Sequence, residues 1–147
     1  MTDKSPFSKL TQIGIVVKDM DETIKKLSSF GIGPFEHRAV PEGAKEYYLG
    51  KPMDGTFKIA AVNLGGVELE FIQPLEGNSP HMKFLEEKGE GIQHIAFAVD
   101  DLENNVKDLK EKGASVQMES DLGMLKVAYM DMETSGLVFE LMQFLKK

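Results

Sequence analysis

The stretch QIGIVVKDMDETIKKLSSFG at residues 12–31 returns, 82 positions later, as HIAFAVDDLENNVKDLKEKG at residues 94–113. In each copy, alternating apolar residues lead to an aspartate, Asp19 or Asp101, whose carboxylate suits a helix N-cap. A helical pattern then ends on a glycine, the residue that most easily takes the left-handed conformation past a helix end. Each copy therefore predicts a strand followed by a helix.

A second repeat marks the last strand of each half. The segment GVELEFIQPL (66–75) matches GLVFELMQFL (136–145), so that Glu70 aligns with Glu140. Both segments are rich in Val, Leu, Ile and Phe, as strands are. Connecting strands are expected near residues 35–41, 57–64, 115–120 and 125–131. The pattern predicts an α+β fold made of two tandem βαβββ modules.

The repeats also set the expected boundaries within one compact domain. The first module is expected at residues 10–73 and the second at residues 92–145. Residues 74–91 form a linker that contains a short helix from about Pro80 to Lys88. The first half is the longer one, and its extra residues fall within KEYYLGKPMDGTFK (45–58), an inserted loop that could cover a pocket.

The composition excludes several classes of function. A formal net charge of −7, with Lys and Glu scattered along the chain, argues against nucleic acid and against a membrane surface as partners. The chain contains no cysteine, which rules out disulfides, thiolate metal sites and a cysteine nucleophile. No apolar stretch approaches the roughly 18 residues of a membrane span, and MTDKSPFSKL (1–10) lacks the apolar core of a secretory leader. We therefore expect a cytoplasmic protein.

Four polar residues occupy equivalent positions in the two repeats. Gln12 and His94 align on the first strands, and Glu70 and Glu140 align on the last strands. Pseudo-twofold symmetry would bring all four to the middle of a concave sheet. Two carboxylates buried together are costly, whereas a divalent cation would neutralise them and accept imidazole nitrogen and amide oxygen as further ligands. The alternative is a dry, partly polar core in which the histidine is simply hydrogen-bonded.

Candidate substrate contacts lie in the first half. Arg38 is the only arginine of the chain, and its planar fork suits a carboxylate or a phosphate. Tyr47 and Lys51 lie in the inserted loop, where residues often set specificity. A solvated arginine and an ordinary hairpin tip are the alternatives for these three residues.

Other residues carry weaker expectations. Glu42 and Glu46 are candidates for a second acid or base. His37, and His81 in the linker, are expected at the surface. The methionines of the expected core strands are assigned to packing: Met130 and Met142.

From about Leu10 to Phe144 the chain resembles the vicinal oxygen chelate superfamily, which includes glyoxalase I, methylmalonyl-CoA epimerase, bleomycin-resistance proteins and extradiol dioxygenases. The segments IGIVVKDMD (13–21) and VELEFIQPLEGNSPHMKFLEEKGEGIQHIAFAVDD (67–101) are most similar to the epimerase branch. GIGPFEHRAV (31–40) is similar to glyoxalase-like members. The resemblance implies that the two modules form a concave, partly open barrel of mixed β-sheet with the helices outside, and that the protein is a homodimer.

The resemblance also implies a ligand set for a divalent metal ion, which would be Zn, Ni, Co or Mn. By position the ligands are Gln12, Glu70, His94 and Glu140. Epimerases typically carry histidine where this chain has Gln12, whereas zinc-type glyoxalase I uses Gln, Glu, His and Glu in this order. Extradiol dioxygenases need two histidines and a carboxylate for Fe(II), so this activity is disfavoured.

The function implied by the resemblance is that of a metal-dependent epimerase or isomerase. It would abstract a proton next to a carbonyl of methylmalonyl-CoA, or of a similar carboxylated compound, through a metal-stabilised enediolate. Glu140 is the first candidate for the base and Glu70 is the second. Two alternatives stay open: a glyoxalase I-like lyase acting on a thiol–aldehyde adduct, and a non-catalytic ligand-binding protein of the bleomycin-resistance type.

Overall fold

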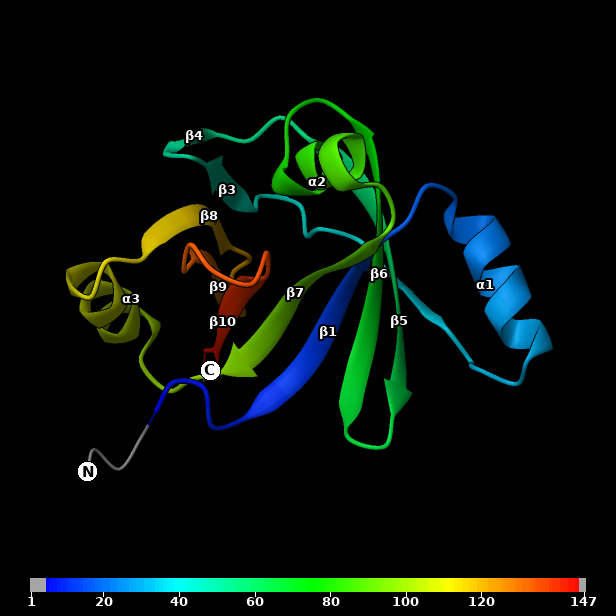
Figure 1. Ribbon diagram of the computed structural model, residues 1–147, viewed down its shortest axis with the longest axis horizontal. Helices are drawn as coiled ribbons and strands as arrows, with labels where there is room; N and C mark the ends of the chain where they lie inside the picture. The colour runs from blue at the N-terminus through cyan, green and yellow to red at the C-terminus, as the bar shows by residue number, and fades with distance from the viewer. Residues whose placement is uncertain (1–4, 146–147) are drawn as a thin grey trace. The chain divides into compact units, whose positions relative to one another are not determined.

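The computed structural model describes residues 5–145, which form two compact units (Figure 1). The N-terminal unit consists of residues 12–39 and 53–93. The C-terminal unit consists of residues 40–52 and 94–145, with residues 5–11. Each unit contains one βαβββ module, which confirms the predicted α+β fold. Among residues 5–145, no helix is long and apolar enough to cross a membrane.

The N-terminal unit is a four-stranded sheet with helix α1 (Met20–Ser29) packed on one face. Its strands are β1 (Leu10–Val16), β2 (Glu36–Arg38), β5 (Thr56–Leu64) and β6 (Val67–Glu76), in the order β2-β5-β6-β1. β1 is parallel to β6, and the other neighbours are antiparallel. Val17 and Phe71 form the core under α1. Because side chains alternate along a strand, Gln12 lies on the face opposite this helix.

The C-terminal unit is a six-stranded sheet with helix α3 (Leu102–Glu111) packed on one face. Its strands are β7 (Gly91–Ala98), β10 (Val138–Phe144), β9 (Leu125–Asp131), β8 (Ser115–Asp121), β3 (Lys45–Tyr48) and β4 (Lys51–Pro52), in this spatial order. Phe97, Met130 and Leu141 form the core under α3. Residues next to these in sequence, including Met142, lie on the face opposite α3. Met130 and Met142 are both buried, which confirms their predicted role in packing.

The two module helices begin in the same way. Asp19 accepts a hydrogen bond from a backbone N–H in the first turn of α1, and Asp101 does the same for α3, as the repeat predicts. Gln73 and Gln143, which align in the second repeat, accept the first N–H of α1 and of α3 at 2.7 and 3.0 Å. This repeated glutamine is therefore a structural residue that joins the last strand of each module to its helix.

The inserted segment, residues 45–58, contains β3 and β4, which form a hairpin, the alternative to an open loop. The pairing of β3 with β8 of the C-terminal unit was not predicted. Without β3, β8 would expose a row of unpaired backbone groups at the edge of the sheet. Pairing with β8 explains why residues 40–52 belong to the C-terminal unit, although they lie within the first half of the sequence.

The linker contains helix α2 (Pro80–Lys88), which has the predicted bounds. The expectation that His81 lies at the surface is wrong, because its side chain is only 1% exposed. Its ring packs against Phe57, with centroids 5.0 Å apart, so this histidine contributes to the packing of α2 on the sheet. His37 on β2 is exposed, as expected.

Candidate functional site

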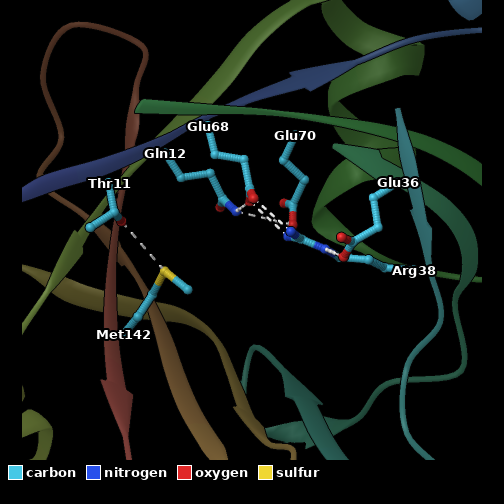
Figure 2. A network of polar contacts seen from close by, with 7 residues as sticks. All are labelled: Thr11, Gln12, Glu36, Arg38, Glu68, Glu70 and Met142. Carbon is cyan, nitrogen blue, oxygen red and sulfur yellow. Dashed lines mark hydrogen bonds and ion pairs between the residues drawn. The ribbon is translucent and has the colours of Figure 1, made fainter. Parts of the chain in front are cut away.

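Gln12 and Glu70 contact each other on the face of the N-terminal unit opposite α1 (Figure 2). The parallel register of β1 and β6 sets Gln12 beside Glu68 and Gly14 beside Glu70. The Gln12 Nε2 atom donates a hydrogen bond to Glu68 Oε1 at 2.9 Å and a longer one to Glu70 Oε2 at 3.3 Å. The structure thus brings together two of the four predicted metal ligands, with Glu68 beside them.

The amide oxygen of Gln12, Oε1, is the atom that would bind a metal ion. Gln12 is 4% exposed, and its Oε1 atom makes no hydrogen bond within residues 5–145. A buried amide oxygen without a partner costs about 1–3 kcal/mol. Carbonyl oxygen is a good donor to a divalent cation, so a bound cation would remove this cost. The arrangement of Gln12 therefore fits the predicted ligand role.

Glu68 is ionised and held by Arg38. The Arg38 Nη1 and Nη2 atoms donate to Glu68 Oε1 and Oε2 at 2.7 and 2.6 Å, and Arg38 Nε donates to Glu36 Oε1 at 3.0 Å. Burial alone would raise the pKa of Glu68, but hydrogen bonds from Arg38 and Gln12, with the Arg38 charge, bring this pKa below its usual value. The hydrogen bond to Glu68 is the main cause that raises the pKa of Arg38.

His94 and Glu140 contact each other in the C-terminal unit. β7 runs parallel to β10, with His94 beside Val138 and Glu140 beside Ala96. His94 Nε2 lies 3.0 Å from Glu140 Oε1, and the two side chains are 0% and 6% exposed. The His94 ring also packs against Tyr129, with centroids 5.0 Å apart. Two atoms that bind one ion at about 2.0–2.2 Å lie about 3 Å from each other, so this pair fits a metal ion.

The predicted ligands therefore occur as two contacting pairs, one in each unit. Their assembly into one four-ligand site stays a prediction. Within residues 5–145, no three His, Asp or Glu side chains are arranged as a metal-binding cluster. The donor types of the two pairs are imidazole nitrogen, carboxylate oxygen and amide oxygen, and they suit Zn, Ni, Co or Mn.

A second carboxylate lies on the same face of the C-terminal unit as Glu140. The register across the sheet aligns Glu46 with Ser120, Ser120 with Val127 and Val127 with Met142, which is two residues from Glu140. The buried Ser120 hydroxyl donates a hydrogen bond to Glu46 Oε2 at 2.8 Å. Glu46 was one of two candidates for a second acid or base, whereas Ser120 was not predicted at all. The contact between Ser120 and Glu46 depends on the pairing of β3 with β8, and local sequence patterns do not indicate this pairing.

The predicted substrate contacts lie in different environments. Arg38 is bound to Glu68 and Glu36, as described above. Tyr47 and Lys51 are exposed on the β3–β4 hairpin. Because side chains alternate along β3, Tyr47 lies on the opposite face from Glu46. The role of these three residues in substrate binding stays a prediction.

Comparisons with known proteins give one matching family model and several relatives. A sequence model described as the Glyoxalase/Bleomycin resistance protein/Dioxygenase superfamily matches residues 11–129. The uncharacterized protein YqjC of Bacillus subtilis is 35% identical over 89 residues, covering 56% of this chain and 62% of that protein. The mitochondrial methylmalonyl-CoA epimerase of Bos taurus is 30% identical over 105 residues, covering 61% of this chain and 60% of that protein. This chain thus spans about three fifths of the length of these relatives.

Solved structures show the same fold. Methylmalonyl-CoA epimerase from Mycobacterium tuberculosis superposes with a TM-score of 0.74 at 21% identity, covering 99% of this chain and 94% of that one. A variant of the Streptomyces coelicolor methylmalonyl-CoA epimerase, in complex with 2-nitronate-propionyl-CoA, gives a TM-score of 0.66 at 22% identity, covering 94% and 98%. At these identities the likeness establishes the fold alone.

Proposed function

This chain belongs to the Glyoxalase/Bleomycin resistance protein/Dioxygenase superfamily, and we propose that it is a metal-dependent epimerase or isomerase that moves a proton next to a carbonyl group. The observation that carries the proposal is the buried contact between His94 and Glu140, whose Nε2 and Oε1 atoms lie 3.0 Å apart. A nitrogen donor and a carboxylate held together in this way suit both a cation and proton transfer.

The proposed ligands are Gln12, Glu70, His94 and Glu140. The buried, unbonded Oε1 atom of Gln12 and the short distance between His94 and Glu140 support this set. When bound, a divalent cation supplies positive charge that stabilises the negative charge developing on the substrate carbonyl oxygen as the proton leaves. Two glutamates balance the charge of such an ion, and the neutral donors add none.

Proton transfer is assigned to two carboxylates on one face. Glu140 removes the proton next to the carbonyl, and Glu46 delivers a proton to the opposite side of the same carbon. Inversion needs two such groups, because removal and return by a single group on one side restores the starting isomer. Strands β9 and β8 lie between β10 and β3, which leaves room for the substrate across this face. The Ser120 hydroxyl orients Glu46 through its 2.8 Å hydrogen bond. Glu70 remains the second candidate for the base.

The proposed substrate is an acyl-CoA such as methylmalonyl-CoA, or a similar carboxylated compound. The relative from Bos taurus is a methylmalonyl-CoA epimerase, which supports this class. A chain with a net charge of −7 needs local cations to bind such an anion. Lys51 is exposed and can supply one. It pairs with Tyr48, which lies on the same face of β3 as Glu46, and Tyr47 precedes Tyr48 in this strand. Arg38 remains a candidate through its remaining N–H groups. We expect the active protein to be a homodimer, which sedimentation would test.

A glyoxalase I-like lyase acting on a thiol–aldehyde adduct is the second candidate. Gln12 favours it, because zinc-type glyoxalase I has glutamine at this place in its ligand order. The two enzymes share the step in which a base removes a proton next to a carbonyl, so Glu140 or Glu70 would act in both.

Elemental analysis combined with two assays tests the proposal. Protein purified without chelator should contain close to one divalent metal ion per chain. It should exchange the α-proton of methylmalonyl-CoA in heavy water and leave a thiol–aldehyde adduct unchanged. The reverse pattern of activity would favour the lyase. Ligand binding without metal and without either activity would favour a binding protein of the bleomycin-resistance type.

A further inference from the structure

Gln12 is a ligand only if its amide is turned the right way. An amide side chain can present either Oε1 or Nε2 to the same place, and only the oxygen can bind a cation. Carboxylates accept hydrogen bonds but do not donate them, so the Nε2 end of Gln12 must face Glu68 and Glu70 (Figure 2). The Oε1 end makes no hydrogen bond within residues 5–145 and is left for a cation. The neighbouring carboxylates therefore select the orientation of the amide.

Glu68 makes the shorter of these two contacts, at 2.9 Å against 3.3 Å for Glu70. A glutamate side chain by itself rotates about three bonds and would not fix its neighbour. Here the two terminal nitrogens of Arg38 bind both carboxylate oxygens of Glu68, an arrangement that fixes the plane of the carboxylate. Arg38 is in turn held by Glu36, two residues away on the edge strand β2. A chain of contacts thus runs from the edge of the sheet to Gln12.

The charges around Gln12 also favour Glu68 as its hydrogen-bond acceptor. Glu68 and Glu70 lie two residues apart on one face of β6, and both contact Gln12. Arg38 compensates the charge of Glu68, so this carboxylate has a cationic partner of its own. Without Arg38, Glu68 would compete with Glu70 for any cation, and its carboxylate could leave Gln12. The pairing with Arg38 keeps Glu68 in the role of hydrogen-bond acceptor.

We propose that Glu68 and Arg38 are positioning residues, which hold the Gln12 amide so that its Oε1 atom is presented to the divalent cation. The inference rests on the proposed function, because it assumes a cation at Gln12. In this proposal Arg38 holds Glu68 in place, whereas the sequence predicts that Arg38 binds substrate. Neither Glu68 nor Arg38 is itself a metal ligand in this account.

Cobalt binding to the full-length protein tests the proposal without substrate. Protein stripped with chelator is titrated with Co²⁺ by calorimetry, and the visible spectrum of the bound ion reports its coordination. Glu68→Gln and Arg38→Met should each weaken Co²⁺ binding about 10–100-fold, as is typical when partners of metal ligands are removed. Arg38→Lys should also weaken it, because a lysine cannot bind both oxygens of Glu68. Unchanged affinity in Glu68→Gln and Arg38→Met would overturn the proposal.

Two controls separate positioning from loss of stability. Asp108 and Lys112 form an exposed ion pair at 3.0 Å on α3, and Asp108→Asn should leave Co²⁺ affinity unchanged. The second control combines Glu68→Gln with Gln12→Ala. If Glu68 acts through Gln12, the double variant should bind Co²⁺ no more weakly than Gln12→Ala alone. Additive losses of Co²⁺ affinity would overturn the proposal. If one of the variants unfolds below the assay temperature, Arg38→Lys is used in its place.

The outcomes separate this inference from the proposed function. A wild-type protein that binds no Co²⁺ contradicts both. A wild-type protein that binds Co²⁺, with variants that bind it equally well, contradicts the positioning role alone. A raised KM for the acyl-CoA in Arg38→Met, with unchanged Co²⁺ affinity, would return Arg38 to substrate binding and overturn the positioning role.

Discussion

The His94 imidazole and the Glu140 carboxylate lie 3.0 Å apart and are both buried in the C-terminal unit. They come from β7 and β10, which pair in parallel, so their side chains point from neighbouring strands to the same face. The equivalent strands of the N-terminal unit, β1 and β6, set Gln12 against Glu70 in the same manner. The internal repeat has thus produced two similar donor pairs.

Removal of His94 should destabilise the protein. His94→Ala leaves the buried Glu140 carboxylate without its imidazole partner, and such a loss costs about 3 kcal/mol. Urea denaturation followed by circular dichroism measures the change. His37→Ala is the matched control, because His37 is exposed, and its effect should stay within about 0.5 kcal/mol. Equal stability of the two variants would contradict a structural contribution from the His94–Glu140 pair.

A bound metal ion should raise the melting temperature. A ligand that binds the folded state at about 1,000 times its Kd stabilises it by about 4 kcal/mol. Chelator-treated protein melted with and without excess Co²⁺ should therefore differ by several degrees. The difference should fall sharply in a Gln12→Ala, Glu70→Gln double variant. Identical melting curves for wild-type protein with and without Co²⁺ would argue against a metal site.

Glu46→Gln should separate proton exchange from inversion. With Glu140 intact, one stereoisomer of the acyl-CoA should still exchange its α-proton in heavy water, but its conversion to the other isomer should fall about 100-fold or more. Proton NMR follows exchange, and a stereospecific coupled assay follows inversion. Ser120→Ala, which removes the 2.8 Å hydrogen bond to Glu46, should cause a smaller loss of the same kind. Inversion at the wild-type rate in Glu46→Gln would exclude Glu46 as the second group.

The capping residues should affect stability alone. Asp101→Ala removes the side chain that accepts a hydrogen bond from the first turn of α3, which should lower the free energy of unfolding by about 1 kcal/mol. Co²⁺ affinity should not change, because Asp101 lies outside the two donor pairs. A loss of Co²⁺ binding in a folded Asp101→Ala protein would mean that α3 contributes to the site.

Much of the fold could be predicted because both repeats are local patterns. The starts of α1 and α3 followed from Asp19 and Asp101, and the bounds of α2 followed from Pro80 and the residues after it. Each predicted ligand was found in contact with one other, because alternation along a strand and a constant offset between repeats fix which residues share a face.

The parts that could not be predicted depend on contacts distant in sequence. β3 pairs with β8, about 70 positions away, and no local sequence pattern predicts such pairing. The same pairing creates the contact between Ser120 and Glu46. His81 was expected at the surface because it follows Pro80 in a polar linker, but α2 turns its ring against Phe57. The link between Arg38 and Glu68 also joins residues from strands that are not neighbours in the sheet.

Exchange of the methylmalonyl-CoA α-proton in heavy water tests the central claim most directly. Metal-loaded wild-type protein should exchange this proton, and chelated protein should lose the activity and regain it with Co²⁺. Glu140→Gln should exchange it at least about 100-fold more slowly while keeping the wild-type circular dichroism spectrum. Glu119→Gln, an exposed position on β8, should behave as wild type. Wild-type exchange in Glu140→Gln, or no exchange by metal-loaded wild-type protein, would contradict the account.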